Sequence, residues 1–226
     1  MKATIHLSLL IILLVTTSAT AATDLQTNNQ KYSYAMGMKI GQMLRGQVNS
    51  DFDIPAFTAA IADLLSGKGS QLTPEQLQAA MKLHFQEESA KRAKLGDANS
   101  EKGKTYREAN ALKDGVVTLD SGLQYKVIKA GEGTTPSKDQ KVEVHYRGHL
   151  IDGKEFDSSY KRGKPAQFSL NGVVAGFSEA ITRMKPGAKW EVVMPPELAY
   201  GKKGAGTDIG PNETLIFEIE YLKAVN

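Results

Sequence analysis

The sequence contains no cysteine among its 226 residues and only four histidines. Without cysteine there is neither a thiol nucleophile nor a disulfide, so the fold must be held by its core alone. His145 and His149 lie on one predicted strand, where a rise of about 3.3 Å per residue separates them by roughly 13 Å. His84 has no candidate partner near it in the sequence. We therefore expect neither a metal site nor a histidine acid–base catalyst.

The sequence also has only a small excess of one sign of charge over the other. The formal net charge is +3, from 28 Lys and Arg against 25 Asp and Glu, and the basic residues never form a run of five. This balance does not favour nucleic acid as a partner. The glycine-rich stretch Gly201–Gly206, GKKGAG, has the wrong spacing for a phosphate-binding loop. The chain therefore offers no cofactor motif, and we expect no cofactor.

The chain has no hydrophobic run that is long enough to cross a bilayer, which takes roughly 20 residues. Its one apolar run, Leu7–Val15, follows Lys2 and precedes the small-residue sequence Ala19-Thr20-Ala21. This order is typical of a secretory signal peptide, which we place at residues 1–21. A short membrane anchor is the alternative. We expect an exported chain without a transmembrane span, located in the periplasm, at the cell surface in association with the outer membrane, or released.

The region after the signal, residues 22–72, is predicted to be a small helical domain. Residues 22–30 are polar and expected to be disordered. Apolar residues then recur at helical spacing over Tyr32–Leu44, with Gly37 and Gly41 four apart as a sign of close helix packing. A second helix begins after Asp53 and ends before Gly67. These pieces make a thin core, so we expect a homodimer through these helices, with packing on the rest of the chain as the alternative.

A long connecting helix is predicted over residues 73–112. It opens with the capping box Thr73–Gln76. Eleven of the 23 residues from 86 to 108 are charged, which is typical of a helix that crosses solvent between domains. Gly96 and Gly103 are the expected points of bending. A charged flexible linker is the alternative.

The remainder, residues 113–226, is predicted to be an α+β domain. Short β-like runs alternate with glycine, proline and aspartate turns, and Asp152-Gly153 signals a hairpin. One helical run, Gly176–Met184, ends at Lys185-Pro186-Gly187. We expect about five or six strands in an antiparallel sheet that wraps around this helix. The expected strands contain Leu123–Ile128, Val142–His149, Phe156, Phe168, Trp190–Met194 and Leu215–Leu222.

Aromatic residues from several of these strands and turns could meet in one place. They can form an apolar binding pocket or simply a hydrophobic core, and the pattern alone leaves both open. Asp157 and Arg162 stand near them in the sequence. The set consists of Tyr146, Phe156, Phe168, Phe177, Tyr200 and Phe217, joined by Val173, Val174 and Ile209.

Four motifs in this domain, EFDSSYKRGKP, VVAGF, PPELAYG and IGPNETLIFEIEYL, resemble the FKBP-type peptidyl-prolyl cis/trans isomerases. The resemblance covers about Gly122–Lys223. Residues 31–112 resemble the N-terminal region of the bacterial Mip/FkpA-like members, which are exported enzymes with a dimerising helical domain. The resemblance implies a fold with an FKBP-like sheet and an activity that accelerates X-Pro bond rotation and assists protein folding. A chaperone or interaction module that binds proline-containing chains with weak catalysis is the alternative.

The resemblance also implies roles for single residues. Val174 would offer its N–H to the substrate carbonyl, and the Tyr200 hydroxyl would be a second donor. Phe177 stands where the family usually has Trp, and Ala166 and Ala205 stand where many members have an aromatic residue and a histidine. The expected catalytic residues are Tyr146, Asp157 and Tyr200. The expected substrate-binding residues are Phe156, Arg162, Phe168, Val173, Val174, Phe177, Ile209 and Phe217.

The expected partners follow from the same resemblance. They are proline-containing peptides and unfolded exported proteins, and the macrolide inhibitors rapamycin and tacrolimus are expected to bind. A role in infection is a further implication of the likeness to Mip.

Overall fold

The computed structural model describes residues 24–45, 48 and 51–225. The predicted signal peptide, residues 1–21, lies outside them. The chain divides into two compact units between Thr58 and Ala59.

Helix α1 (Asn28–Leu44) belongs to the first unit. The Thr27 hydroxyl accepts a hydrogen bond from the Gln30 N–H at 3.2 Å, and the Gln30 side chain accepts one from the Thr27 N–H at 2.8 Å. Because this capping box starts the helix at Asn28, the expectation of disorder is wrong for the last three residues of 22–30. None of the α1 side chains is buried.

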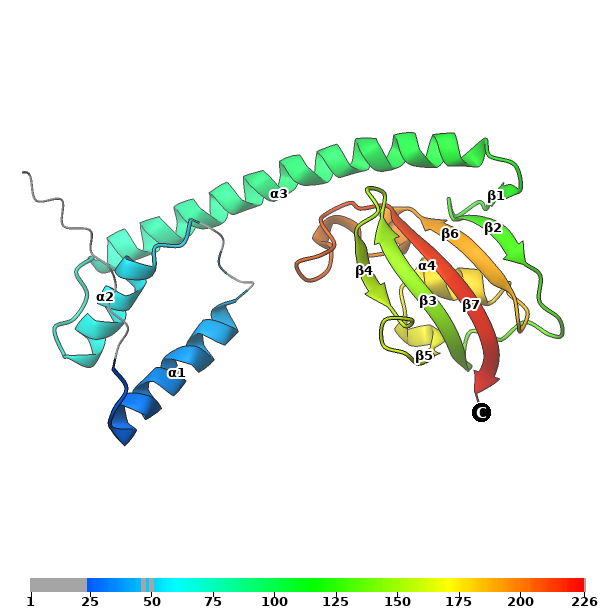
Figure 1. The fold of residues 1–226 in the computed structure, drawn as a ribbon. Coiled ribbons are helices and arrows are strands. Elements are labelled where there is room, and N and C mark those ends of the chain that lie inside the picture. The colour runs from blue at the N-terminus through cyan, green and yellow to red at the C-terminus, as the bar shows by residue number, and fades with distance from the viewer. Residues whose placement is uncertain (1–23, 46–47, 49–50, 226) are drawn as a thin grey trace, which may run out of the picture. The chain divides into compact units, whose positions relative to one another are not determined.

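Helices α2 (Ile54–Leu65) and α3 (Pro74–Ala111) begin where the sequence predicts. The Asp53 carboxylate accepts a hydrogen bond from the Ala56 N–H at 2.8 Å, and Thr73 caps α3 with Gln76 as expected. Helix α3 runs unbroken for 38 residues (Figure 1), so the alternative of a flexible linker is wrong. Within the described residues, no helix is both long and apolar enough to span a membrane.

The C-terminal half of α3 packs on the sheet that follows it, rather than crossing solvent. The buried Asn99 side chain donates to the Pro211 carbonyl at 2.9 Å, and that of Asn110 donates to the Gln124 side chain at 2.9 Å. Gly103 is buried between them in the sequence. The expectation of a helix exposed on all sides is therefore wrong for this half, and the helix continues without a break through Gly96 and Gly103. This half of α3 contacts the sheet through side-chain amides and glycine, so its sequence shows no helical repeat of apolar residues that would predict the packing.

The sheet has seven antiparallel strands, one more than the upper expectation. Their order is β1-β2-β6-β7-β3-β4, and β5 pairs with the same edge of β3 as β4. The short β1 was not predicted, because three residues are too few for a recognisable alternation. The strands are β1 (Val116–Thr118), β2 (Gln124–Lys129), β3 (Lys141–Leu150), β4 (Glu155–Ser158), β5 (Ala166–Ser169), β6 (Lys189–Met194) and β7 (Leu215–Val225).

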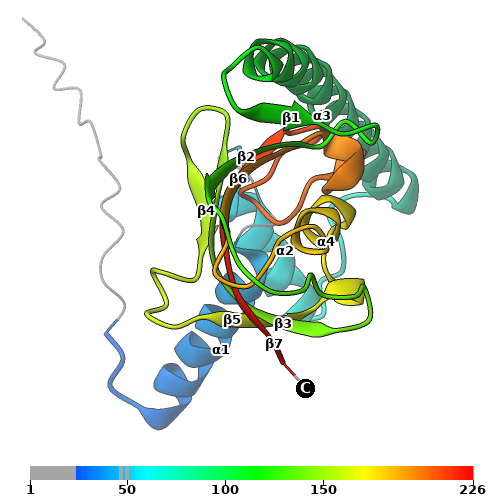
Figure 2. The ribbon, with the colours of Figure 1, turned by 90° about the vertical axis from the view of Figure 1, so that its right-hand side faces the viewer.

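The sheet curves around helix α4 (Ala175–Ile181), which lies on its concave side (Figure 2). The helix ends three residues before the predicted Met184. Burial of these apolar side chains is the main stabilising term of the domain. The core between helix and sheet includes the fully buried side chains of Leu123, Val142, Val144, Ile181, Met184, Val192, Met194, Leu215 and Ile219.

Candidate functional site

An open cavity of about 500 Å³ brings the predicted residues together. Every residue predicted to form the site lines this cavity except Arg162, which contacts two residues that do. We call it the aromatic cavity. Its lining consists of Tyr146, Phe156, Asp157, Phe168, Gly172, Val173, Val174, Phe177, Tyr200, Ala205, Gly206, Asp208, Ile209 and Phe217.

The base of the cavity is a cluster of rings centred on Phe177. The ring centroids of Tyr146 and Phe168 each lie 5.8 Å from that of Phe177, and the Phe217 centroid lies 5.5 Å away, all edge-on. Edge-to-face packing is a preferred arrangement of aromatic pairs. Tyr146, Phe177 and Phe217 are only 4–5% exposed, so these rings belong to the hydrophobic core as well as to the cavity. The aromatic residues thus form part of the core and also line a cavity.

Gly148 makes room for this cluster. A Cβ atom at this position would lie 2.5 Å from the Phe156 ring and 2.7 Å from the Phe217 ring. Any side chain on Gly148 would therefore push apart two rings that pack at 5.5 Å between centroids. Sequence reasoning did not find Gly148, although a glycine within the apolar–polar alternation of VEVHYRGHL was a usable signal.

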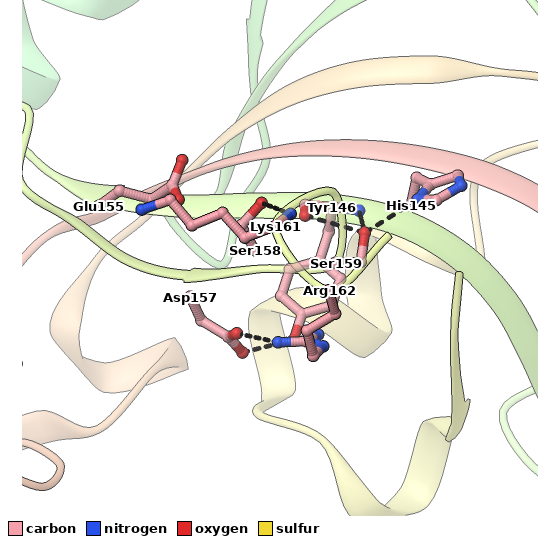
Figure 3. Close-up of polar contacts among 8 residues, drawn as sticks. All are labelled: His145, Tyr146, Glu155, Asp157, Ser158, Ser159, Lys161 and Arg162. Atoms are coloured by element: carbon pink, nitrogen blue, oxygen red, sulfur yellow. Dashed lines mark hydrogen bonds and ion pairs between the residues drawn. The ribbon is translucent and has the colours of Figure 1, made fainter. Parts of the chain in front are cut away.

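One wall of the cavity is polar. The Tyr146 hydroxyl donates a hydrogen bond to one Asp157 carboxylate oxygen, and Arg162 forms an ion pair with the other (Figure 3). Arg162 also donates to the Tyr146 hydroxyl at 2.8 Å, and its guanidinium lies 5.4 Å from the centre of the Tyr146 ring. The three side chains thus fix one another in a closed triangle.

These contacts decide the charge of the wall. Burial, followed by the hydrogen bond to the Asp157 carboxylate, raises the pKa of Tyr146 to about 12. Burial alone would raise the pKa of Asp157, but the hydrogen bonds from Tyr146 and Arg162 outweigh it and hold this pKa below its usual value. At neutral pH the wall therefore carries a carboxylate, a guanidinium and a neutral phenol.

Ser159 anchors the backbone that carries Tyr146. Its buried hydroxyl accepts a hydrogen bond from the Tyr146 N–H at 2.8 Å, and its own N–H donates to the Tyr146 carbonyl at 2.9 Å (Figure 3). These bonds stand where β3 changes its partner from β5 to β4. Sequence reasoning did not assign this residue a role. Its position two residues after Asp157 was the only available signal.

Two residues that line the cavity carry hydrogen-bond donors without a partner among the described residues. Within the part of the chain that the structure describes, no hydrogen bond occupies the Val174 N–H or the Tyr200 hydroxyl. Tyr200 is 41% exposed at the rim. On the same rim, sequence reasoning missed Asp208, which forms an ion pair with Lys154 at 2.9 Å. The described residues contain no group of three or more His, Asp or Glu side chains that could hold a metal ion.

Comparison with known proteins assigns the family. Residues 132–222 match the model of the FKBP-type peptidyl-prolyl cis-trans isomerases, and residues 29–127 match that of the domain amino-terminal to these isomerases. Peptidyl-prolyl cis-trans isomerase Mip of Coxiella burnetii is 43% identical over 215 residues, 93% of each chain. The FKBP-type 22 kDa peptidyl-prolyl cis-trans isomerase of Escherichia coli is 44% identical over 191 residues, which are 84% of this chain and 93% of that protein.

A solved structure supports the same assignment. The crystal structure of FkpA from Escherichia coli matches with a TM-score of 0.61 and 37% sequence identity, covering 88% of this chain and 98% of FkpA. Relatives and fold therefore agree with the resemblance found in the motifs. The chain belongs to the FKBP-type peptidyl-prolyl cis-trans isomerases and is an enzyme of that class, with relatives named Mip and FkpA.

Proposed function

We propose that this isomerase binds a proline of an unfolded exported protein in the aromatic cavity and thereby assists the folding of that protein. The observation that carries the proposal is the cavity itself, which combines a floor of buried rings with one charged wall and two unoccupied donors. Such a site can bind and desolvate an apolar ring while it orients the neighbouring amide.

The proposed mechanism acts on amide resonance. Resonance keeps the X-Pro bond planar and places negative charge on the carbonyl oxygen, so unaided rotation takes tens to hundreds of seconds. In the twisted state this resonance is lost. The twisted bond is less polar than the planar bond, so moving the bond from water into a site lined by aromatic rings favours the twisted state. A fixed donor that binds the carbonyl oxygen of the twisted bond better than that of the planar bond adds to this effect.

Single residues have distinct proposed roles. The Val174 N–H binds the carbonyl of the substrate, and the Tyr200 hydroxyl donates a second hydrogen bond. Asp157 provides a fixed negative charge beside the rotating bond, and Tyr146 and Arg162 hold that charge in place. The proposed reaction involves no covalent intermediate and no proton transfer, because rotation about the bond requires neither.

This mechanism predicts a flat pH profile. Asp157 has a lowered pKa, so its contribution to stability is present above its unfolded pKa and is lost as the pH falls through the lowered value. Tyr146 has a raised pKa, so its contribution is present below 10 and is lost as the pH rises towards about 12. We expect kcat/KM for a cis-prolyl peptide to vary less than about twofold between roughly pH 6 and 9. A bell-shaped profile in that range would indicate proton transfer.

A refolding experiment distinguishes assisted folding from simple client binding. The test protein is one whose refolding is limited by a proline bond, and both its refolding rate and its aggregation are followed. We expect wild type to accelerate the slow phase and Asp157→Ala to lose most of that acceleration. Suppressed aggregation with an unchanged slow phase would instead favour the chaperone alternative.

A homodimer through the N-terminal helices is proposed as the working form. The support is the exposed apolar face of α1, where Tyr32 is 68% and Met43 is 72% exposed, and where no atom of the described residues lies within 4 Å of a Cβ atom built on Gly37 or Gly41. Sedimentation of residues 22–226 should give a dimer, and Met43→Glu should shift it to the monomer. Lys39→Glu, on the same helix, is the control. A monomeric wild type would contradict the proposal.

Export and macrolide binding complete the proposed function. Residues 1–21 would direct the chain out of the cytoplasm, to the periplasm or the cell surface. Rapamycin and tacrolimus are proposed to occupy the aromatic cavity. Export is tested by cell fractionation, which compares the location of the full chain with that of a chain that starts at residue 22. Only the full chain should leave the cytoplasm.

A further inference from the structure

A second cavity, of about 780 Å³, lies beside the aromatic cavity. It is formed by the loop before β3, the 3-10 turn η1 (Leu170–Gly172) and one face of α4. The proposed mechanism assigns it no role. We call it the flank cavity. It is lined by Pro136, Ser137, Lys138, Leu170, Asn171, Val173, Ala175, Ser178, Glu179, Thr182 and Arg183.

A single stretch of backbone separates the two cavities. Along residues 171–175, Gly172 and Val174 line only the aromatic cavity, Asn171 and Ala175 line only the flank cavity, and Val173 lines both. The stretch is thus a ridge with one cavity on each side. A polypeptide that enters the aromatic cavity and continues over this ridge reaches the flank cavity directly.

The ridge also offers free backbone groups to such a chain. Among the described residues, neither the Val174 N–H nor the Val173 carbonyl has a hydrogen-bond partner. These two groups belong to one trans peptide bond and point in opposite directions, so a crossing chain can form a backbone hydrogen bond with either of them. They lie where the substrate would cross from one cavity to the other.

The polar groups of the flank cavity indicate what it would accept. Ser178 lines the cavity, and its hydroxyl has no hydrogen-bond partner within the described residues. This hydroxyl is therefore free to bond to a polar group of a ligand at this point. Arg183 and Glu179 neutralise each other at 3.2 Å. The exposed Lys138 has no ion pair in the described chain, so the lining residues carry one net positive charge; Asp139, the next residue, does not line the cavity.

We propose that the flank cavity is a specificity subsite, which receives the stretch of the same substrate chain next to the bound proline and prefers an acidic side chain there. This proposal rests on the proposed binding of proline in the aromatic cavity. With this subsite the enzyme would contact a longer stretch of the substrate than the aromatic cavity alone can contact. It would therefore select among proline bonds by the residues that flank them.

The test compares long and short substrates. A tetrapeptide with one proline serves as the short substrate. The long substrates extend it by four residues on either side, with the added residues carrying Glu or Lys in an otherwise identical sequence. The enzymes are wild type, Lys138→Glu and the control Lys129→Glu, whose lysine is exposed on β2 and lines neither cavity. Each kcat/KM is divided by that of the same enzyme on the tetrapeptide.

We expect wild type to prefer the Glu-extended over the Lys-extended substrate by about threefold to fivefold, the range of an exposed ion pair. Lys138→Glu should abolish or reverse the preference, and Lys129→Glu should retain it. Amide resonances of Ser178 and Thr182 should shift on binding a long peptide and not on binding the tetrapeptide. Lack of a preference, or its loss in both variants, overturns the subsite while leaving the proposed function intact. Failure to isomerise the tetrapeptide overturns both.

Discussion

Asp157→Ala is expected to lower kcat/KM for a cis-prolyl peptide by about 10- to 100-fold. The change removes the carboxylate that accepts from Tyr146 and pairs with Arg162. Hydrogen bonds to charged groups are worth about 1.5–3 kcal/mol, and each 1.4 kcal/mol corresponds to a factor of ten. Arg162 and the Tyr146 hydroxyl would also lose their fixed positions at the wall of the cavity. The measurement is a protease-coupled isomerisation assay.

Asp120→Ala provides the matched control, because Asp120 is exposed and lines neither cavity. It should leave the rate unchanged, and both variants should remain folded at the temperature of the assay. Tyr200→Phe is the companion variant, which removes only the second proposed donor. If Asp157→Ala and Tyr200→Phe both isomerised the peptide at the wild-type rate, the assignment of these residues would be wrong.

Gly103→Val is expected to destabilise the unit that begins at Ala59 by about 2–3 kcal/mol, the upper range for overpacking a buried site. A Cβ atom on Gly103 would lie 2.3 Å from the Thr214 hydroxyl oxygen and 3.1 Å from the Arg107 guanidinium. Thr214 is fully buried directly before β7, so it has little room to move. Urea unfolding followed by circular dichroism measures the loss.

Lys104→Val controls for the poorer helix propensity of valine, because Lys104 is the next residue of α3 and is exposed. It should cost only a few tenths of a kcal/mol to about 0.7 kcal/mol. Equal stability losses in the two variants would mean that α3 does not pack on the sheet at Gly103. The result therefore decides whether the C-terminal half of α3 is part of the isomerase fold.

The sheet was predictable because its strands alternate apolar and polar residues between clear turn signals. Val144 and Tyr146 face the core, and Glu143 before them and Arg147 after them are less buried, so the pattern of β3 is visible in the sequence. The contacts of α3 were not predictable by the same logic. Asn99 makes them through its amide, without any apolar stripe that the sequence could display.

The site was predictable where a side chain meets the cavity and not where a residue acts through the backbone. Tyr146 and Asp157 were found from their types and from the family motif. Gly148 acts through the absence of a side chain, and Ser159 acts by bonding the main chain of a residue on another strand. Both roles depend on register between strands, which becomes known only with the fold.

The most direct test of the account is the isomerisation of a cis-prolyl tetrapeptide by residues 22–226, with and without rapamycin. The account predicts a rate well above the uncatalysed one, abolished by rapamycin because both compete for the aromatic cavity. Catalysis that persists at saturating rapamycin would place the reaction elsewhere in the chain. Binding of the peptide without acceleration would contradict the proposed mechanism, in which a desolvated, fixed donor site suffices for catalysis without a nucleophile.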